Sequence, residues 1–417
     1  MPLPSPIPPS TPTETPHSRH FVLFSIGHSV SSIGSWAQKT GIGWLTWELT
    51  QSVAWVGTIA MADLIAALWV APLAGAVADR SNPYRLFCLT QLLTLSLALV
   101  LCLATATGVL TIYGLLAFAI MEATLQGFNH PVRMLLINLL APRERLSQAV
   151  ATNSIAVALA RSIGPAFAGL VMYFGSVALV FAINAVSFIA ILGVVFHLRR
   201  WLDRLPLARG TALMRDMAEG FRYVARTPEI TTVIFLAAAF ALLARPFSEL
   251  LPAFAGDVFS GGPEVLSMLM TAQGVGALLG SAFMLRGHNN RALVRSVLVT
   301  GLGLAASLLA FTASNSLTVA LPAMVAAGLF HVVCNIAMQS LCMLQSEPAL
   351  RGRVVALYGL IFRTGPSVGA FCIAHAAQWT TLGTLVGACA IAYAGLLAFT
   401  LPAVRRIGSP AVVEAEK

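Results

Sequence analysis

Long apolar segments recur along the whole chain, and each ends at a short polar stretch or at a cluster of Pro and Gly. A helix needs about 20 mostly apolar residues to cross a lipid bilayer. Segments of this length predict an all-α integral membrane protein whose even number of spans puts both termini on one side. The predicted spans are twelve and lie near 21–48, 54–77, 84–106, 109–132, 147–172, 175–198, 230–254, 264–285, 293–313, 317–341, 353–377 and 380–403.

The longest polar connection separates six spans from six others. We expect a disordered Pro-rich tail, a first six-helix bundle, a linker, a second bundle and a second tail, at 1–20, 21–198, 199–229, 230–404 and 405–417. In the linker, apolar residues at helical spacing predict an amphipathic helix. These residues are Leu213, Met217, Phe221 and Val224. Such a helix could lie on the membrane surface or form a solvated linker, and the pattern leaves both readings open.

The composition agrees with a membrane protein. Hydrophobic residues make up 58% of the chain and charged residues 10%, with a mean hydropathy of +0.83. Soluble proteins carry about a quarter charged residues, so a soluble enzyme and a nucleic-acid binder are excluded despite the net charge of +9. Outside the predicted spans, every Lys and Arg lies in a tail or an even-numbered connection. The positive-inside rule therefore places both termini in the cytoplasm.

The sequence offers little support for an enzyme or a metal protein. The six cysteines fall in or beside apolar segments, and none forms a CxxC pair or a zinc-type spacing with His. There is no P-loop, no HExxH and no recognisable Ser/His/Asp arrangement. We therefore expect no metal, no cofactor and no ATP-driven pump.

Charged residues inside the predicted spans are the main functional signal, because each costs about 2.5–3.5 kcal/mol to insert at the bilayer centre. Spans one, four, seven and ten carry polar residues three or four positions apart, which places them on one helix face. Lipid cannot satisfy such groups, so we expect the faces to line a shared aqueous cavity. The cavity candidates are Ser35, Gln38, Lys39, Gln126, Asn129, Arg161, Arg245, Asn335, Gln339 and Arg363. The alternative is that the charges only join helices, through pairs such as Lys39–Asp63, Arg161–Glu122 and Arg245–Glu249.

The embedded charges comprise four cations and three carboxylates, and the excess favours an anionic substrate. A carboxylate in a low dielectric can bind and release a proton near neutral pH, and histidine titrates in the same range. The proton-coupling candidates are Glu122 as first choice, then Asp63, Glu249 and His331. For His331 alone a hydrogen-bonded core histidine is the favoured interpretation, and its titration range keeps it as a proton-relay candidate.

Two motifs point to a known family. Gly75, Asp79 and Arg80 form a GxxxDR pattern between spans two and three, which resembles the conformational loop of the major facilitator superfamily. Spans five and eleven each carry an Arg followed by Gly-Pro, and such internal repeats are typical of transporters built from two halves. A Gly-Pro kinks a spanning helix, which suggests hinges at Gly164-Pro165 and Gly365-Pro366.

Other segments resemble the enterobactin-exporter-like branch of that superfamily, among them IGSWAQKTGIGWLTWELTQS, RPFSELLPAFAGDVF and LRGRVVALYGL. The resemblance implies two six-helix bundles that work by alternating access, with spans one, four, seven and ten around the cavity. It also implies a monomeric carrier of a bacterial inner membrane that exports a small amphipathic molecule in exchange for protons. A siderophore-like anion is the favoured substrate class. The alternatives are multidrug efflux of cationic or neutral compounds, or a receptor or scaffold that keeps the carrier fold without transport.

Overall fold

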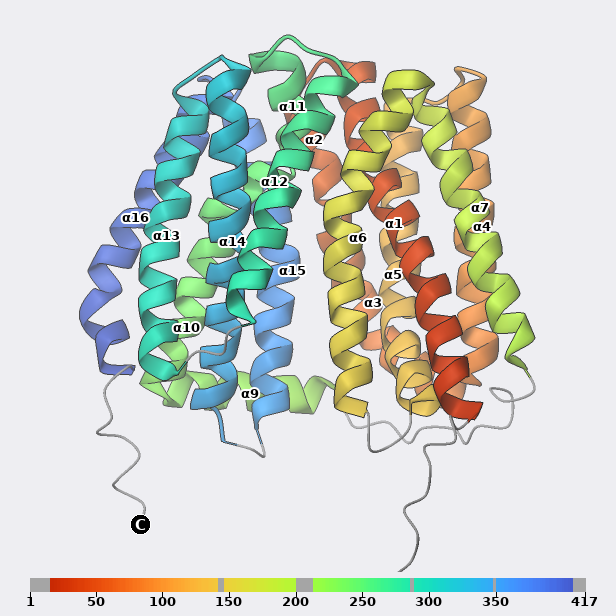
Figure 1. The fold of residues 1–417 in the computed structure, drawn as a ribbon, viewed down its shortest axis with the longest axis horizontal. Coiled ribbons are helices and arrows are strands. Elements are labelled where there is room, and N and C mark those ends of the chain that lie inside the picture. Colours follow the sequence, from red (N-terminus) through yellow and green to blue (C-terminus); the bar gives the residue numbers. More distant parts are fainter. Residues whose placement is uncertain (1–15, 142–145, 200–212, 286–288, 348–349, 408–417) are drawn as a thin grey trace, which may run out of the picture.

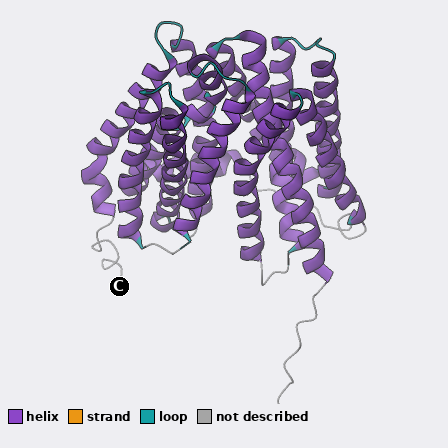
Figure 2. Cartoon of the chain, turned by 45° about the horizontal axis from the view of Figure 1, so that its top comes forward, coloured by secondary structure: helices purple, strands orange, loops and turns teal. Residues whose placement is uncertain are grey.

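The computed structural model describes residues 16–141, 146–199, 213–285, 289–347 and 350–407. All regular elements in this part of the chain are helical (Figure 2). They are α1 (Pro16–Thr50), α2 (Val53–Ala60), α3 (Ala62–Arg80), α4 (Pro83–Ala106), α5 (Ile112–Leu140), α6 (Leu146–Phe174), α7 (Val177–His197), α9 (Leu213–Arg226), α10 (Pro228–Ala239), η2 (Phe240–Ala244), η3 (Pro246–Ser248), α11 (Leu251–Ala253), η4 (Phe254–Val258), α12 (Pro263–Met284), α13 (Asn290–Thr312), α14 (Leu317–Gln345), α15 (Arg351–Ala376) and α16 (Leu382–Ile407).

The helices lie where the apolar segments predict them, with differences at some ends. The first helix begins at Pro16, so the last residues of the predicted tail are helical. Helix α5 continues to Leu140, beyond the predicted end at 132. In the described residues, eight helices are long and apolar enough to cross a membrane, and 53–67 and 159–174 are shorter apolar helices. The count of twelve spans remains a prediction.

Two groups of helices stand side by side, with α1–α7 in one and α10–α16 in the other (Figure 1). We call them the N half and the C half. Within the N half α1 packs on α6 and α7, and within the C half α14 packs on α12 and α13. The halves meet chiefly where α6 packs on α12 and where α2 packs on α15.

The closest approaches between the halves lie at the end that carries the odd-numbered connections, at the top of Figure 1. There Gly57 of α2 faces α15 so closely that a Cβ would lie 2.9 Å from the carbonyl oxygen of Ala370. A Cβ on Gly169 of α6 would overlap Ser267 of α12. Glycine is therefore required at this interface for steric reasons, because any side chain would push the halves apart.

Among the described residues, the buried apolar clusters agree with a junction of the halves at the upper end. One core cluster extends through the C half and continues into the upper part of the N half, for example to Trp47 and Phe181. A second cluster, which includes Phe24, Phe87 and Phe188, contains residues of the N half alone. In Figure 1 the ribbons of the two halves diverge toward the lower end, where this second cluster lies.

The first spanning helix of the C half is broken, which the sequence pattern did not predict. The segment predicted as one span at 230–254 runs from α10 through η2, η3 and α11 to the end of η4 at Val258. Proline has no N–H to donate, so Pro246 and Pro252 interrupt the regular α-helical bonds. The backbone N–H of Arg245 instead donates to the carbonyl of Phe240 at 3.0 Å, five residues back.

The linker contains the predicted helix, α9, which lies along the lower end beside the C half (Figure 1). Its Glu219 carboxylate pairs with Arg353 of α15 at 2.9 Å, and the hydroxyl of Tyr223 accepts from the backbone N–H of Glu347 at 3.2 Å. Val224 is buried, whereas Phe221 is 66% exposed. The predicted apolar residues therefore do not form one buried face. The side of α9 that carries Val224 packs on the C half, whereas Phe221 faces away from it. The side chains of Leu213 and Met217 lie outside the described part.

Candidate functional site

A cluster of charged side chains lies between the two halves. The ammonium of Lys39 on α1 lies 3.1 Å from Oδ2 of Asp63 on α3 and 3.4 Å from Oε2 of Glu249, which follows η3. Lys39 and Asp63 belong to the N half, whereas Glu249 belongs to the C half. The Lys39 ammonium is thus shared between two carboxylates and ties the halves together by charge.

This cluster is reached by solvent although it lies deep in the fold. The side chains of Lys39, Asp63 and Glu249 are exposed to 42%, 32% and 20%. An ion pair with this exposure lines a space between the halves, because a packed core would cover it. The pair Lys39–Asp63 is one of the three that the sequence suggested. No ion pair joins Arg161 to Glu122, or Arg245 to Glu249, among the residues described.

All seven embedded charges lie within electrostatic reach of this centre. Glu122 of α5 interacts electrostatically with Asp63 and Lys39. Arg161 interacts with Glu249, and Arg363 interacts with Asp63. Residues from both halves therefore converge, which is the arrangement that the polar stripes predict for a common cavity.

Two of the embedded arginines stack on aromatic rings, and the ammonium of Lys39 also lies 5.7 Å from the ring centre of Trp36. The guanidinium of Arg161 on α6 lies 4.9 Å from the ring centre of Trp36 on α1. The guanidinium of Arg245 lies 4.0 Å from the ring centre of Phe362 on α15 and donates to the carbonyl oxygen of the same residue. Cation–π contacts of this kind contribute about 0.5–2 kcal/mol.

The four cations differ in how strongly they are held. Lys39 is shared by two carboxylates, and Arg245 is fixed by Phe362. Arg161 and Arg363 are exposed, and in the described part of the chain neither has a carboxylate within ion-pair distance. Within the described residues the cluster therefore has two exposed arginines that no carboxylate neutralises through an ion pair.

The polar residues of α14 lie beside the cluster, on the C half. His331 is buried, and its ring centre lies 5.3 Å from that of Phe240 with the two ring planes nearly perpendicular. Its Nδ1 has no hydrogen-bond partner within the described chain. Asn335 accepts a hydrogen bond from the hydroxyl of Tyr358 at 2.6 Å through Oδ1. Gln339 is half-buried one turn further along.

Some of the candidate residues are engaged inside the N half. The Oε1 atom of Gln38 accepts from the amide of Asn184 at 2.9 Å, and both residues are buried. The amide of Asn129 donates to Gln91 at 3.2 Å, also in the core. The hydroxyl of Ser35 donates to the carbonyl of Ser31 in its own helix. Gln126 is half-buried on α5.

The two Gly-Pro motifs occupy matching places in the two halves. Helices α6 and α15 run through them without interruption. A Cβ on Gly164 would lie 2.9 Å from the carbonyl oxygen of Ile33 on α1, and a Cβ on Gly365 would meet Ala241 in η2. Each motif, with Pro165 or Pro366, therefore packs on the first helix of its own half. The loop motif Gly75, Asp79 and Arg80 ends α3, and its side chains lie outside the described part.

The structure adds residues that polarity alone did not single out. Trp36 and Phe362 hold the two arginines, and Tyr358 stacks on Phe362 at 6.0 Å. The amide of Gln273 on α12 donates to Ser248 at 2.6 Å, next to Glu249. A usable signal was sequence proximity, since Trp36 precedes Lys39 by one helical turn and Phe362 directly precedes Arg363.

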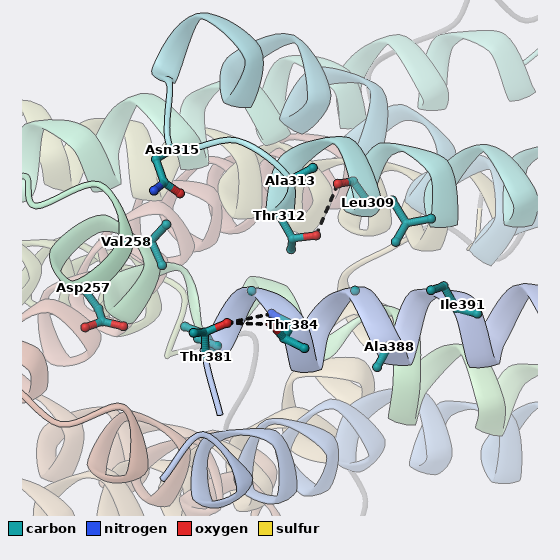
Figure 3. Close-up of a pocket in the computed structure, with 13 residues that line it drawn as sticks. Asp257, Val258, Leu309, Thr312, Ala313, Asn315, Thr381, Thr384, Ala388 and Ile391 are labelled. Carbon is teal, nitrogen blue, oxygen red and sulfur yellow. Dashed lines mark hydrogen bonds between the residues drawn. The ribbon is translucent and has the colours of Figure 1, made fainter. Parts of the chain in front are cut away.

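A separate cavity lies between the end of α13, the start of α16 and η4 (Figure 3). Its volume is about 760 Å³, and none of the embedded charges lines it. No group of three or more metal-ligating side chains occurs among the residues that the structure describes.

The comparisons with known proteins agree with this architecture. A family described as transmembrane secretion effector matches residues 13–416 of the chain. The Staphyloferrin A transporter of Staphylococcus aureus is 22% identical over 268 residues, which cover 63% of this chain and 64% of that protein. The match therefore spans less than two thirds of the length of that relative.

Solved structures show the same fold at low identity. A bacterial homologue of the human lysosomal transporter Spinster, inward-facing and unoccupied, superposes with a TM-score of 0.66 at 14% identity, over 95% of this chain and 97% of that one. A bacterial homologue of the iron transporter ferroportin in an inward-facing state gives 0.70 at 11% identity, over 94% and 99%.

Proposed function

Because the chain belongs to the major facilitator superfamily, in its transmembrane secretion effector family, we propose that it exports a small amphipathic anion in exchange for protons. The family and the relatives are transporters. The chain is accordingly a multi-pass membrane transporter and not an enzyme. A bacterial inner membrane and a monomeric carrier belong to the same proposal.

The observation that carries the proposal is the shared ammonium of Lys39, with exposed Arg161 and Arg363 nearby. A cavity for a cation would need free carboxylates, whereas here Asp63 and Glu249 are both engaged by Lys39. Arg161 and Arg363 outnumber Glu122, the embedded carboxylate that makes no ion pair in the described part of the chain, and these two arginines mark the place where a carboxylate or catecholate group would bind. The similarity to a Staphyloferrin A transporter supports a siderophore-like substrate.

The state of the molecule supports an alternating-access cycle. The halves touch at the end with the odd-numbered connections and diverge toward the other end (Figure 1). If the positive-inside rule holds for this chain, the diverging end faces the cytoplasm. Together with the partly exposed side chains of Lys39 and Asp63, this supports our proposal that the conformation is the inward-facing state of the cycle. Switching to the opposite conformation must separate the glycine contacts at Gly57 and Gly169.

The Lys39–Glu249 contact couples the two ligands to that switch. A bound anion competes with Glu249 for Lys39, and a proton neutralises the carboxylate, so either ligand can break the contact between the halves. The anion breaks it on the way out, and the proton breaks it on the way back. A ligand can shift such an equilibrium only through its different affinity for the two states. Glu122 and Asp63 are the further proton-binding candidates, and His331 remains one.

The test uses inside-out membrane vesicles with an acidic interior and a fluorescent pH probe. We expect proton release when a catecholate or carboxylate siderophore is added, and loss of the signal in Glu122→Gln and Glu249→Gln. Glu48→Gln, which changes an exposed carboxylate outside the cluster, is the matched control. Release with cationic dyes alone would instead indicate multidrug efflux. Protons that move in the same direction as the anion would contradict the exchange.

A further inference from the structure

The cavity at the odd-numbered end of the C half has a polar mouth and an apolar floor. Its polar side chains come from three elements that meet there (Figure 3). They are Asp257, Thr312, Asn315, Thr381 and Thr384. Thr381 and Thr384 share a hydrogen bond of 2.7 Å between their hydroxyls, and the hydroxyl of Thr312 donates to the carbonyl of Leu309 at 3.3 Å.

Asp257 is the one charged residue that lines this cavity, and it is exposed. Within the described residues it makes no ion pair, and neither Asp257 nor Asn315 makes a side-chain hydrogen bond. The chain has no Lys or Arg in any odd-numbered connection from which a partner could come. A cation that neutralises Asp257 must therefore come from outside the protein.

The floor of the cavity continues into the apolar outer surface of the C half. Leu309 is 37% exposed and Ile391 is 61% exposed, and both line the cavity. Gly383 and Gly387 of α16 widen it, because a Cβ on Gly387 would lie 3.4 Å from the Thr312 hydroxyl and 3.7 Å from Leu309. A hollow that is charged at the aqueous end and apolar along its length has the polarity of a phospholipid.

We propose that this cavity binds a phospholipid with a primary ammonium headgroup, such as phosphatidylethanolamine, from the membrane leaflet on that side. The ammonium donates hydrogen bonds to Asp257 and Asn315, and the hydroxyls of Thr381 and Thr384 face the phosphate. An acyl chain lies along Leu309 and Ile391. Charge-assisted hydrogen bonds are short and roughly twice as strong as neutral ones, which selects an ammonium over an uncharged headgroup.

Native mass spectrometry of the full-length protein measures the selectivity. The purified protein is titrated in detergent with phosphatidylethanolamine, phosphatidylcholine and phosphatidylglycerol. We expect about tenfold tighter binding of phosphatidylethanolamine than of phosphatidylglycerol, because a hydrogen bond to a charged group is stronger than one between neutral groups. Phosphatidylcholine falls between them because its quaternary ammonium cannot donate. Equal binding of all three lipids would overturn the proposal.

Two variants locate the site. Asp257→Asn removes the charge and should abolish the preference, whereas Glu48→Gln, an exposed carboxylate of the N half, should not. Gly387→Leu fills the cavity and should weaken binding, whereas Gly395→Leu on the same helix, where a Cβ meets nothing within 4 Å, should not. If glycerophosphoethanolamine without acyl chains competes as well as the lipid, the site is one for soluble amines and the lipid assignment is wrong.

Discussion

Each half of the protein stacks an arginine on an aromatic ring, but the two contacts run in opposite directions. In the N half the arginine comes from the helix with the Gly-Pro motif and the ring from the first helix, as Arg161 on Trp36. In the C half the arginine follows the first helix and the ring precedes the Gly-Pro motif, as Arg245 on Phe362. In both halves the contact joins the first spanning helix to the helix with the Gly-Pro motif. The helix that supplies the arginine in one half supplies the ring in the other.

The exchange leaves the two halves with different tasks. Arg245 is also fixed by the carbonyl of Phe362, whereas Arg161 is exposed and has no ion-pair partner in the part of the chain described. Helix α1 is continuous and carries Lys39 toward the other half, whereas the broken segment around Pro246 turns its arginine inward. The stacked arginine of the N half is therefore exposed to the space between the halves, whereas the stacked arginine of the C half holds its own helices together. The cation that the C half leaves exposed is Arg363 on α15.

The largest effect is expected at Lys39, which presents its charge to both halves. Lys39→Gln removes both ion pairs and leaves Asp63 and Glu249 uncompensated, so anion-dependent proton release should fall by about 100-fold. The rate is measured in the vesicle assay with protein levels matched by immunoblot. Lys39→Arg retains the charge and should recover part of the rate. An unchanged rate in Lys39→Gln would remove Lys39 from the mechanism.

The next effect tests whether the halves move as two bodies. A Cβ on Gly169 would overlap Ser267 across the interface, and overpacking costs about 1–3 kcal/mol. Gly169→Ala should therefore disfavour the outer-closed state and lower transport by about tenfold. Gly193→Ala, where nothing lies within 4 Å, is the control. Accessibility of an introduced cysteine at Ser35 to a cytoplasmic reagent should fall in Gly169→Ala alone.

A third prediction separates the two arginines directly. Arg161→Ala should raise the half-saturating anion concentration about tenfold with little change in thermal stability. Arg245→Ala should lower the thermal stability and leave the half-saturating anion concentration nearly unchanged, because it removes a stacking contact and a carbonyl hydrogen bond inside the C half. Transport titrations and melting curves in detergent measure the two quantities. If both variants change only stability, the contrast between an exposed Arg161 and a structural Arg245 is wrong.

The positions of the helices could be predicted from the lengths of the apolar segments. The apolar segments gave the places of the helices, and the spacing of Lys39, Glu122 and Arg245 indicated that the charged faces converge. The break after α10 was missed because prolines are tolerated in spanning helices and do not by themselves fix a break. The contacts of Phe362 and Trp36 were missed because an aromatic ring in an apolar segment carries no polar signal.

The sequence also did not predict which partner each polar side chain of a helix would contact. Gln38 and Lys39 are neighbours, yet Gln38 bonds Asn184 in the core while Lys39 faces the other half. A step of one residue turns a side chain by about 100° around a helix, so the partner depends on which helices are adjacent. Adjacency is set by packing between segments far apart in sequence.

The smallest effect is expected where the linker helix α9 contacts the C half. Glu219 is half exposed in its pair with Arg353, and exposed ion pairs contribute only about 0.2–1 kcal/mol. Glu219→Ala should therefore lower the melting temperature by a degree or two in low salt and by less in high salt, since salt screens such pairs. Transport should change less than twofold. Arg222→Ala, an exposed residue of the same helix, is the control. A transport loss comparable with that of Lys39→Gln would show that α9 governs the switch, and the division between the halves would have to include the linker.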